Sequence, residues 1–138
     1  WVPGMIQDAI LGKPHECIYA AADDPGAPII YVTDAARAAD MILQAPKNNI
    51  KMVNYCVSGI RDALSVNELE TVLKRRYPKT EITYRAPVGG LPVSVIKKFD
   101  DSCARKEWEW KPLYDSPEAI IDKFERDVRE RARYFGLA

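Results

Sequence analysis

The sequence predicts one α/β (α+β) domain over residues 1–138, with a small, partly parallel sheet, flanking helices and a long C-terminal helix. Short runs rich in β-branched and aromatic residues alternate with segments whose apolar residues recur at helical spacing. Strands that alternate with helices favour crossover connections, and therefore parallel pairing. The length of 138 residues suits a single domain, and the chain has no internal repeat and no obvious linker.

The N-terminal segment is expected to form a helix, a short strand and a turn. Val2–Leu11 has helical spacing, with Pro3 in its first turn and Gly12 as its stop signal. A short strand is expected over Cys17–Ala20, and the Asp-Asp-Pro-Gly sequence of residues 23–26 is typical of a turn. The helix is expected to bury Met5, Ile6, Ala9 and Ile10.

A strand, a helix and a second strand are expected to follow. Pro28–Thr33 is rich in β-branched and aromatic residues, which favour a strand. Asp34 is a suitable N-cap for a helix over Ala35–Gln44, and Pro46 closes that helix. Lys51–Ser58 is then expected to form the next strand.

A capping box marks the start of the next helix. The Ser65 hydroxyl can accept the amide of Glu68 while the Glu68 side chain reaches back, and the helix ends before Pro78. A third strand is expected over Glu81–Arg85, and Ala86–Phe99 is expected to be an irregular, ligand-facing loop. The helix is expected to bury Leu69, Val72, Leu73 and Tyr77.

The C-terminal part is expected to be helical. Asp100–Glu109 is typical of a short helix, and Ser116 caps the longest one, which runs from Pro117 to about Phe135. Asp101 is expected to act as a helix cap. Along the last helix, the expected i,i+4 ion pairs are Asp122–Arg126, Glu125–Arg129 and Asp127–Arg131.

Charge and composition exclude two kinds of partner. The 20 basic and 20 acidic residues give a net charge of zero, unlike the excess of Lys and Arg in nucleic-acid binders. No apolar run approaches the ~20 residues of a membrane span, and the N-terminus lacks the order of a signal peptide.

The three cysteines (Cys17, Cys56 and Cys103) are expected to be reduced and mostly buried in a cytoplasmic protein.

No motif of the chain supplies complete catalytic machinery. The sequence has no Gly-x-Gly-x-x-Gly for a pyrophosphate and no Tyr-x-x-x-Lys pair. His15 is the only histidine, and it is expected to be exposed in a turn, so we expect no metal site. Ser94 and Lys97 match the Ser-x-x-Lys pattern of some hydrolases, but the partner motifs are missing. Of Trp108 and Trp110, one is expected in the core and the other over a groove or an interface.

Three ordered segments nevertheless resemble a known family. Residues 29–38 contain Tyr-Val-x-Asp-x-x-x-Ala, residues 65–69 read Ser-Val-Asn-Glu-Leu, and residues 100–105 read Asp-Asp-Ser-Cys-Ala-Arg with Trp108, Trp110 and Pro112 behind them. This order resembles the extended short-chain dehydrogenases, the NAD-dependent epimerase/dehydratase family, from about Met5 to about Phe124. Within the family, the L-threonine 3-dehydrogenase branch is most similar, because of Gln-Ala-Pro at 44–46, Tyr-Pro at 77–78 and the doubled Asp before Ser102.

The resemblance implies a substrate-binding C-terminal lobe without the Rossmann nucleotide-binding half. In that family the residues that move the proton and the hydride lie upstream, so we expect no catalytic and no cofactor-binding residue in this chain. NAD is implied only for a full-length parent. The resemblance places the substrate at the junction of the two lobes, facing Tyr31, Ser58, Pro87, Gly89, Gly90, Leu91 and Ser94.

Three departures separate the chain from the family pattern. Cys56 stands where family members carry Asn after Tyr, and the loop at Gly90–Ser94 lacks the Trp of the threonine dehydrogenases. Glu109 stands where the family has Gly. A second hypothesis is a truncated or remodelled non-catalytic module that self-associates through the former lobe interface, because removal of a packed lobe would uncover an apolar surface. The expected partner is therefore either a missing nucleotide-binding lobe or a second copy of the chain, and a Ser94/Lys97 hydrolase is a third, weaker hypothesis.

Overall fold

The computed structural model describes residues 1–17, 21–22, 24–85 and 96–135. Residues 18–20 of the predicted first strand, Asp23 of the predicted turn, and the predicted site residues Pro87, Gly89, Gly90, Leu91 and Ser94 lie outside this part. The described helices and strands, in chain order, are α1 (Val2–Leu11), β1 (His15–Cys17), β2 (Ala27–Ile29), α2 (Val32–Gln44), the 3₁₀-helix η1 (Lys47–Asn49), β3 (Ile60–Leu64), α3 (Val66–Arg76), β4 (Ile82–Tyr84), α4 (Ser102–Trp108) and α5 (Pro117–Glu130).

The described strands form two separate two-stranded sheets. β1 pairs with β4 in parallel, with Glu16 opposite Thr83, and β2 pairs with β3 in antiparallel, with Ala27 opposite Leu64. An isolated bridge joins Asp62 to Lys98 beside β3. The predicted α/β class is confirmed, and so is parallel pairing for one of the two sheets.

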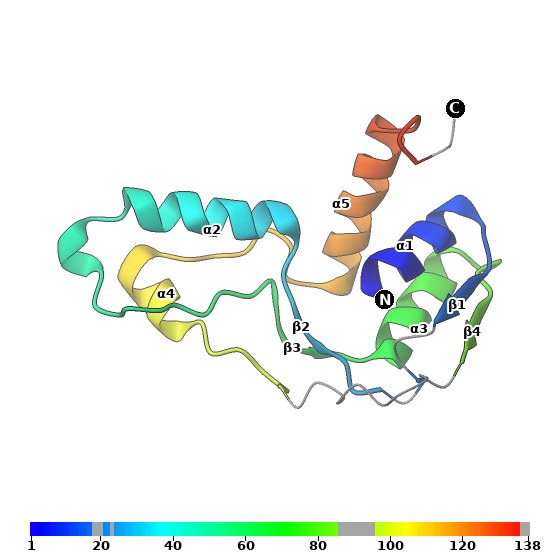
Figure 1. The fold of residues 1–138 in the computed structure, drawn as a ribbon, viewed down its shortest axis with the longest axis horizontal. Helices are drawn as coiled ribbons and strands as arrows, with labels where there is room; N and C mark the ends of the chain where they lie inside the picture. The colour runs from blue at the N-terminus through cyan, green and yellow to red at the C-terminus, as the bar shows by residue number, and fades with distance from the viewer. Residues whose placement is uncertain (18–20, 23, 86–95, 136–138) are drawn as a thin grey trace.

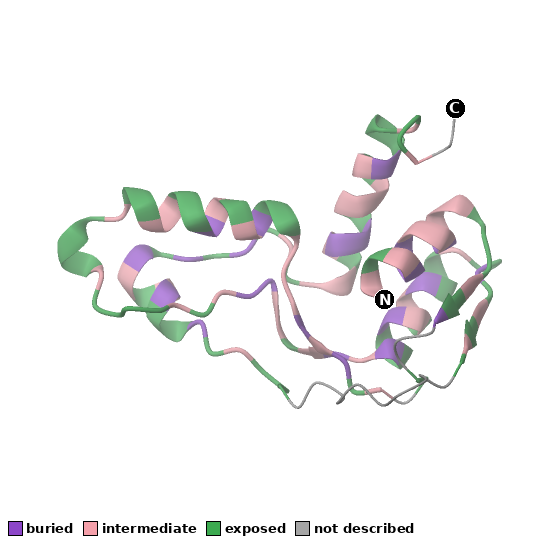
Figure 2. Ribbon diagram, viewed as in Figure 1, coloured by how far each residue is buried: buried purple, intermediate pink, exposed green. Residues whose placement is uncertain are grey.

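The helices gather at two ends of an elongated molecule (Figure 1). α1, α3 and α5 pack against one another beside the β1–β4 sheet, and we call this group the helical body. α2 and α4 extend away from it and form what we call the arm, with the β2–β3 pair between the two. Buried residues lie on the inward faces of both groups (Figure 2). The core of the arm consists of Ala38, Ala104, Trp108 and Trp110.

The helices whose local signals are strongest begin where they were predicted to begin. α1 spans Val2–Leu11 and ends at Gly12, whose φ of 64° is left-handed. Ser65 and Glu68 form both hydrogen bonds of the capping box of α3. Ser116 accepts the amide of Ala119 at 3.2 Å at the start of α5. Each signal acts within one helical turn, so distant contacts do not change it.

The start of α2 differs from the prediction. The helix begins at Val32, three residues before the expected Ala35, and Tyr31 occupies its N-cap position. Asp34 is not the cap, because its side chain is fully buried and its Oδ2 accepts the amides of Leu113 at 2.8 Å and Tyr114 at 3.0 Å. A carboxylate that serves the backbone of a distant segment ties the arm to the chain entering α5.

The strand predicted over Lys51–Ser58 is wrong, and β3 forms over Ile60–Leu64 instead. The amides of Lys51 and Met52 donate to the Tyr55 hydroxyl at 3.0 and 3.1 Å, so they are not available to a ladder. Pairing with β2 starts only at Gly59, whose amide donates to the Ile29 carbonyl at 3.0 Å. A Cβ added at residue 59 would lie 2.6 Å from the Tyr114 carbonyl oxygen, so only glycine fits at this position before β3.

Asp101 does not cap α4 with its side chain. The Asp100 carboxylate accepts the Ser102 amide at 3.0 Å, whereas Asp101 is fully buried between two arginines. Arg61 Nε of β3 lies 3.2 Å from Asp101 Oδ1, and Arg105 of α4 contacts both carboxylate oxygens at 2.8–2.9 Å. Asp101 therefore joins α4 to β3, a connection that sequence spacing does not reveal.

Both indole rings are buried, which corrects the expectation that one of them covers a groove or an interface. α4 ends at Trp108, and Glu109 turns the chain with a left-handed φ of 60°. This turn returns Trp110 to the core of the arm, where the centroids of the two rings are 5.9 Å apart. The residue at the position of the family Gly thus adopts the conformation that favours glycine.

Glu109→Gly is expected to stabilise the chain by about 1 kcal/mol, because a residue with a Cβ is strained at positive φ and Gly is not. Thermal unfolding of the two proteins followed by circular dichroism measures the effect. Lys106→Gly, an exposed position three residues earlier inside α4, is the control, and it should destabilise by about 1 kcal/mol. An unchanged or lower melting temperature for Glu109→Gly would contradict the strain argument.

Three other expectations need correction. The three cysteines are free as expected, but only Cys17 is buried, and Cys56 and Cys103 are exposed. α5 ends as a helix at Glu130 and continues as turns, rather than reaching Phe135. Of the three predicted ion pairs on α5, Glu125–Arg129 is present at 2.5 Å, whereas Asp122 pairs with Arg76 and Asp127 pairs with Lys123.

Glu125 is the centre of a network between α3 and α5. Its carboxylate accepts from Arg129 at 2.5 Å, from the Tyr77 hydroxyl at 2.8 Å and from Arg76 at 2.7 Å. Hydrogen bonds from Arg129, then Tyr77 and Arg76, lower the pKa of Glu125 from 4.5 to about 2. The network therefore holds α5 against the end of α3.

Acid should weaken this network in a defined range. The folded pKa of Glu125 is below its unfolded value, so its contribution is present above about 4.5 and is lost as the pH falls toward about 2. We expect a loss on the order of 1–2 kcal/mol after solvent screening. Urea unfolding between pH 6 and about 2.5 should show a shallower decline for Glu125→Gln than for the wild type. Glu118→Gln, at the exposed pair with Arg75, should leave the slope unchanged.

Candidate functional site: an apolar pocket between the body and the arm

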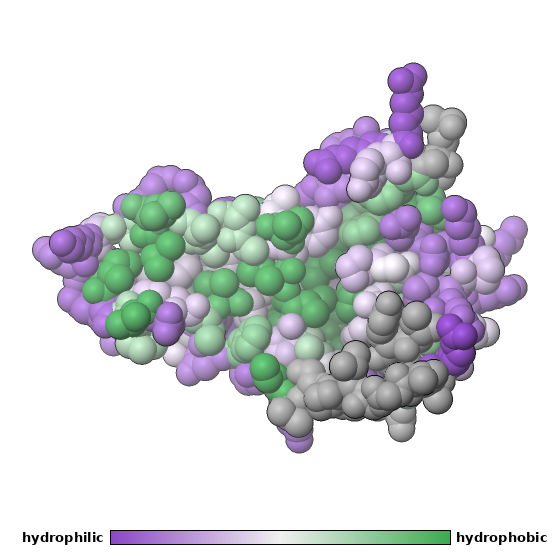
Figure 3. Space-filling view, in the orientation of Figure 1, coloured by the Kyte–Doolittle hydropathy of each residue, from purple (hydrophilic) through white to green (hydrophobic). Residues whose placement is uncertain are grey.

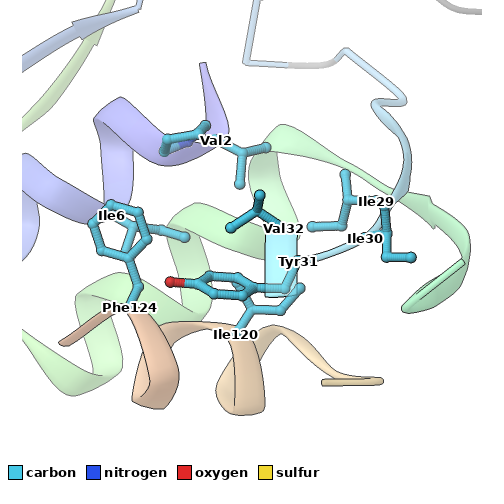
Figure 4. Close-up of a pocket in the computed structure, with 9 residues that line it drawn as sticks. Val2, Ile6, Ile29, Ile30, Tyr31, Val32, Ile120 and Phe124 are labelled. Carbon is cyan, nitrogen blue, oxygen red and sulfur yellow. The ribbon is translucent and has the colours of Figure 1, made fainter. Parts of the chain in front are cut away.

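A pocket of about 290 Å³ lies where α1, the β2–α2 junction and α5 meet (Figure 4). The side chains come from segments far apart in the sequence, because the first helix and the last helix pack against each other. β2 delivers residues 29–32 to the pocket as it runs into α2. The lining residues are Val2, Pro3, Ile6, Ile29, Ile30, Tyr31, Val32, Ile120 and Phe124.

Tyr31 brings the only hydroxyl group among the lining side chains (Figure 4). Its hydroxyl donates to Asp127 Oδ2 at 2.6 Å, and Asp127 also pairs with Lys123. The Lys123 ammonium lies 5.7 Å from the centroid of the Tyr31 ring. Burial and the hydrogen bond to Asp127 raise the pKa of Tyr31 above its usual range. Tyr31 therefore stays protonated at neutral pH, and its hydroxyl hydrogen is already donated to Asp127.

This arrangement determines which chemistry the pocket can support. The walls are apolar, and the hydroxyl of Tyr31 is occupied by a carboxylate from α5. A zwitterionic amino acid or a phosphate would lose its hydration there without a charged partner, which costs several kcal/mol. The pocket instead favours an apolar group, because burial of its surface against the apolar walls lowers the free energy.

Ser58 does not line this pocket. It is fully buried, and its Oγ has no hydrogen-bond partner among the residues that the structure describes. Tyr31 is therefore the one predicted site residue that the structure places at the pocket, and the predicted residues between 87 and 94 lie outside the described part. A substrate role for the full set stays a prediction.

The described residues do not fit an NAD pyrophosphate. Such a site needs glycines that bring backbone amides to the phosphates at the N-terminus of a helix. Gly26 and Gly59 lie against other backbone segments, and a Cβ added at Gly4 would lie 3.2 Å from the His15 ring, which fills the space beside it. Gly12 is open but follows the C-terminus of α1, where the helix dipole repels an anion.

The described residues form neither a metal-binding cluster nor a membrane-spanning helix. His15 is not exposed in a turn as expected, because it lies in β1 with its Nδ1 2.7 Å from Asp8 Oδ2. The described part of the chain contains no group of three or more His, Cys, Asp or Glu side chains that could hold a metal ion. None of its helices is long and apolar enough to span a bilayer.

Sequence reasoning missed two residues of the site. Asp127 was assigned to a pair with Arg131, but it accepts from Tyr31, 96 positions earlier. Lys123 was not singled out at all, although it completes the group. The helical spacing of Ile120 and Phe124 did indicate an apolar face on α5. No signal in the sequence paired that face with Tyr31, because the pairing depends on how α5 packs.

Comparison with known proteins gives consistent relatives, although no family model matches the chain. The mitochondrial L-threonine 3-dehydrogenase of Bos taurus is 32% identical over 118 residues, which are 84% of this chain and 31% of the bovine protein. The GalE-like L-threonine dehydrogenase of Cupriavidus necator superposes with a TM-score of 0.73 at 23% identity, over 90% of this chain and 44% of that one.

The same fold occurs in a protein with another reaction. An NAD-dependent NDP-hexosamine 5,6-dehydratase of tunicamycin biosynthesis superposes with a TM-score of 0.68 at 17% identity, over 94% of this chain and 40% of that one. The structural likeness thus shows the fold, and the fold does not select a reaction. The chain spans about a third of the length of the curated relatives it matches.

Proposed function

The chain is homologous to a part of the L-threonine 3-dehydrogenases and shares the fold of extended short-chain dehydrogenases, and on this premise we propose that it is the substrate-side, C-terminal portion of such an NAD-dependent oxidoreductase or epimerase. In this proposal the chain does not catalyse the reaction by itself. It forms one wall of the substrate site, and a nucleotide-binding lobe supplies NAD and the residues that transfer the hydride. The partial coverage of the relatives carries the proposal, because 84% of this chain matches only 31% of the bovine protein.

The internal chemistry of the chain supports the same division of labour. The sequence has neither the Gly-rich turn nor the Tyr-x-x-x-Lys pair of the family. Tyr31, the tyrosine at the pocket, is protonated, donates its hydroxyl hydrogen to Asp127 and has a raised pKa, so it is a poor proton donor or base at neutral pH. Three free cysteines support the expected cytoplasmic location, although the bovine relative is mitochondrial by name.

NAD binding by the chain alone tests this proposal. At millimolar NAD, the melting temperature of the 138-residue chain should not change, because the described glycines cannot cradle a pyrophosphate. The product of the complete gene that encodes this chain should gain stability from NAD and should reduce it with L-threonine or another small substrate. A clear NAD-dependent shift of the 138-residue chain, or a whole gene product that does not bind NAD, would contradict the proposal.

A second candidate is the non-catalytic module that self-associates. Exposed apolar side chains favour it, since Val53 is 99% exposed, Leu43 85% and Leu113 61%. In this case sedimentation velocity should give a mass that rises with protein concentration. A monomer at all concentrations would exclude this candidate and leave the first unaffected.

A further inference from the structure

A second groove lies at the tip of the arm, where α2 and α4 both end (Figure 1). Its volume is about 400 Å³, and a neighbouring hollow of about 400 Å³ shares Asn49, Lys106 and Glu107 with it, so the two are contiguous. Hydrophilic and hydrophobic residues lie next to each other over this end of the arm (Figure 3). The groove therefore offers charged, amide and apolar groups together, unlike the apolar pocket between the body and the arm.

Several polar side chains of the groove take no part in holding the fold. Glu107 does take part, because its carboxylate accepts the Lys51 amide at 2.9 Å and the Tyr55 hydroxyl. Four others line the groove and form no side-chain hydrogen bond or ion pair among the residues that the structure describes. These four are Gln44, Asn49, Lys106 and Glu109. Their polar groups are available to a ligand.

The charges around the groove favour a ligand that carries both signs. α2 and α4 end there, and the carbonyl groups at a helix C-terminus attract a positive group. α2 has no basic residue in its last turn to neutralise this end, and Glu109 adds a carboxylate. Lys106 supplies an ammonium for a negative group, and the side-chain amides of Gln44 and Asn49 can donate to the same group.

One wall of the groove is apolar. Met41, Ala45 and Pro46 contribute to it, together with the ring of Trp108, which is only 6% exposed. Trp108 Nε1 has no acceptor among the described residues, so this wall contains a buried donor that the chain leaves unsatisfied. An aliphatic side chain of a ligand would be buried against these residues.

We propose that this groove binds a small α-amino acid as a zwitterion. The ammonium lies at Glu109 and the C-terminal end of α2, and the carboxylate lies at Lys106. An aliphatic side chain packs against Pro46 and Trp108. The site is independent of the proposed function, because none of its residues lines the apolar pocket. Both charged partners are exposed, and exposed ion pairs are weak, so we expect a Kd in the millimolar range.

Titration of the isotope-labelled 138-residue chain with L-leucine, followed by its amide chemical shifts, tests the site. Leucine should shift amides between residues 44 and 49 and between residues 106 and 110, and it should leave those at 2–6 and 120–124 unchanged. Isocaproate lacks the ammonium of leucine, and isoamylamine lacks its carboxylate. At equal ionic strength, each should bind about threefold to fivefold more weakly than leucine, which is the effect of one exposed ion pair.

Two variants separate the two ends of the ligand. Lys106→Gln should weaken the binding of leucine and isocaproate about threefold to fivefold, but not that of isoamylamine. Glu109→Gln should weaken leucine and isoamylamine, but not isocaproate, and it keeps the Cβ at positive φ, so the turn is unchanged. Lys79→Gln and Glu130→Gln, exposed in the α3–β4 turn and on α5, are the matched controls and should leave every Kd unchanged.

Three results would overturn the proposal. The first is the absence of any shift with leucine at the groove, and the second is a set of shifts at the apolar pocket instead. The third is binding of isoamylamine or isocaproate as tight as that of leucine, because the groove would then not recognise a zwitterion.

Discussion

Replacing Gly26 by Ala is expected to remove about 3–5 kcal/mol of stability, or to prevent folding. Gly26 has a φ of 71°, and an added Cβ would lie 1.7 Å from the Leu64 carbonyl oxygen and 2.6 Å from its carbon. Strain at positive φ accounts for about 1–2 kcal/mol. The remainder comes from the overlap, which can be relieved only by moving β2 away from the end of β3, since Ala27 is paired with Leu64.

Gly12→Ala is the matched control, because Gly12 has a similar φ of 64° but no heavy atom within 4 Å of its added Cβ. It should cost about 1–2 kcal/mol. Urea unfolding of both variants isolates the close approach as the difference between them. Equal losses would show that the contact with Leu64 contributes nothing. A displacement of β2 in Gly26→Ala would also disturb the pocket, because β2 leads directly to Tyr31 in the pocket wall.

Asp101→Asn is expected to destabilise the chain by about 2–4 kcal/mol. The buried carboxylate is shared by Arg61 of β3 and Arg105 of α4, and a neutral amide leaves both guanidinium groups without their counter-charge. Both arginines are partly exposed, so water offsets some of the loss and keeps it below that of a fully buried pair. The loss should release α4 and the two indole rings of the arm before the helical body unfolds.

The adjacent residue offers a control with the same chemistry. Asp100 is exposed and accepts hydrogen bonds from Ser102, its neighbour two positions along, so Asp100→Asn should cost clearly less than Asp101→Asn. In a Trp1→Phe background, which removes the tryptophan packed against the helical body, tryptophan fluorescence during urea unfolding reports on the arm, and far-ultraviolet circular dichroism reports on all helices. Separation of the two transitions in Asp101→Asn, and not in Asp100→Asn, is the expected result. Coincident transitions of unchanged midpoint would contradict the role given to Asp101.

The elements that the sequence predicted well are those whose signals are local. Pro3 and Gly12 bound α1, and the Ser65–Glu68 box starts α3, because each acts within one turn of helix. The ordered motifs also predicted homology to the threonine dehydrogenases, as the bovine relative confirms.

The predictions that failed involve pairs of residues far apart in the chain. Asp34 has the composition of a cap, yet its carboxylate accepts the amide of Leu113, 79 positions later. Asp101 was expected to cap α4, but Arg61 lies beside it. A polar residue near a helix start can cap the helix or bind a distant group. Which arrangement has the lower free energy depends on which backbone amide or charged side chain the fold brings within reach.

Local spacing and ordered motifs were enough to predict the α/β class, the helices α1, α3 and α5 with their terminal signals, and the family of the relatives. The tertiary structure set the register of β3 and the burial of Asp34 and Asp101. It also decided the pocket, since α1, the start of α2 and α5 form its walls only after the first and last helices pack together. Contacts between distant segments depend on how the whole chain buries its apolar faces, and local spacing does not contain that information.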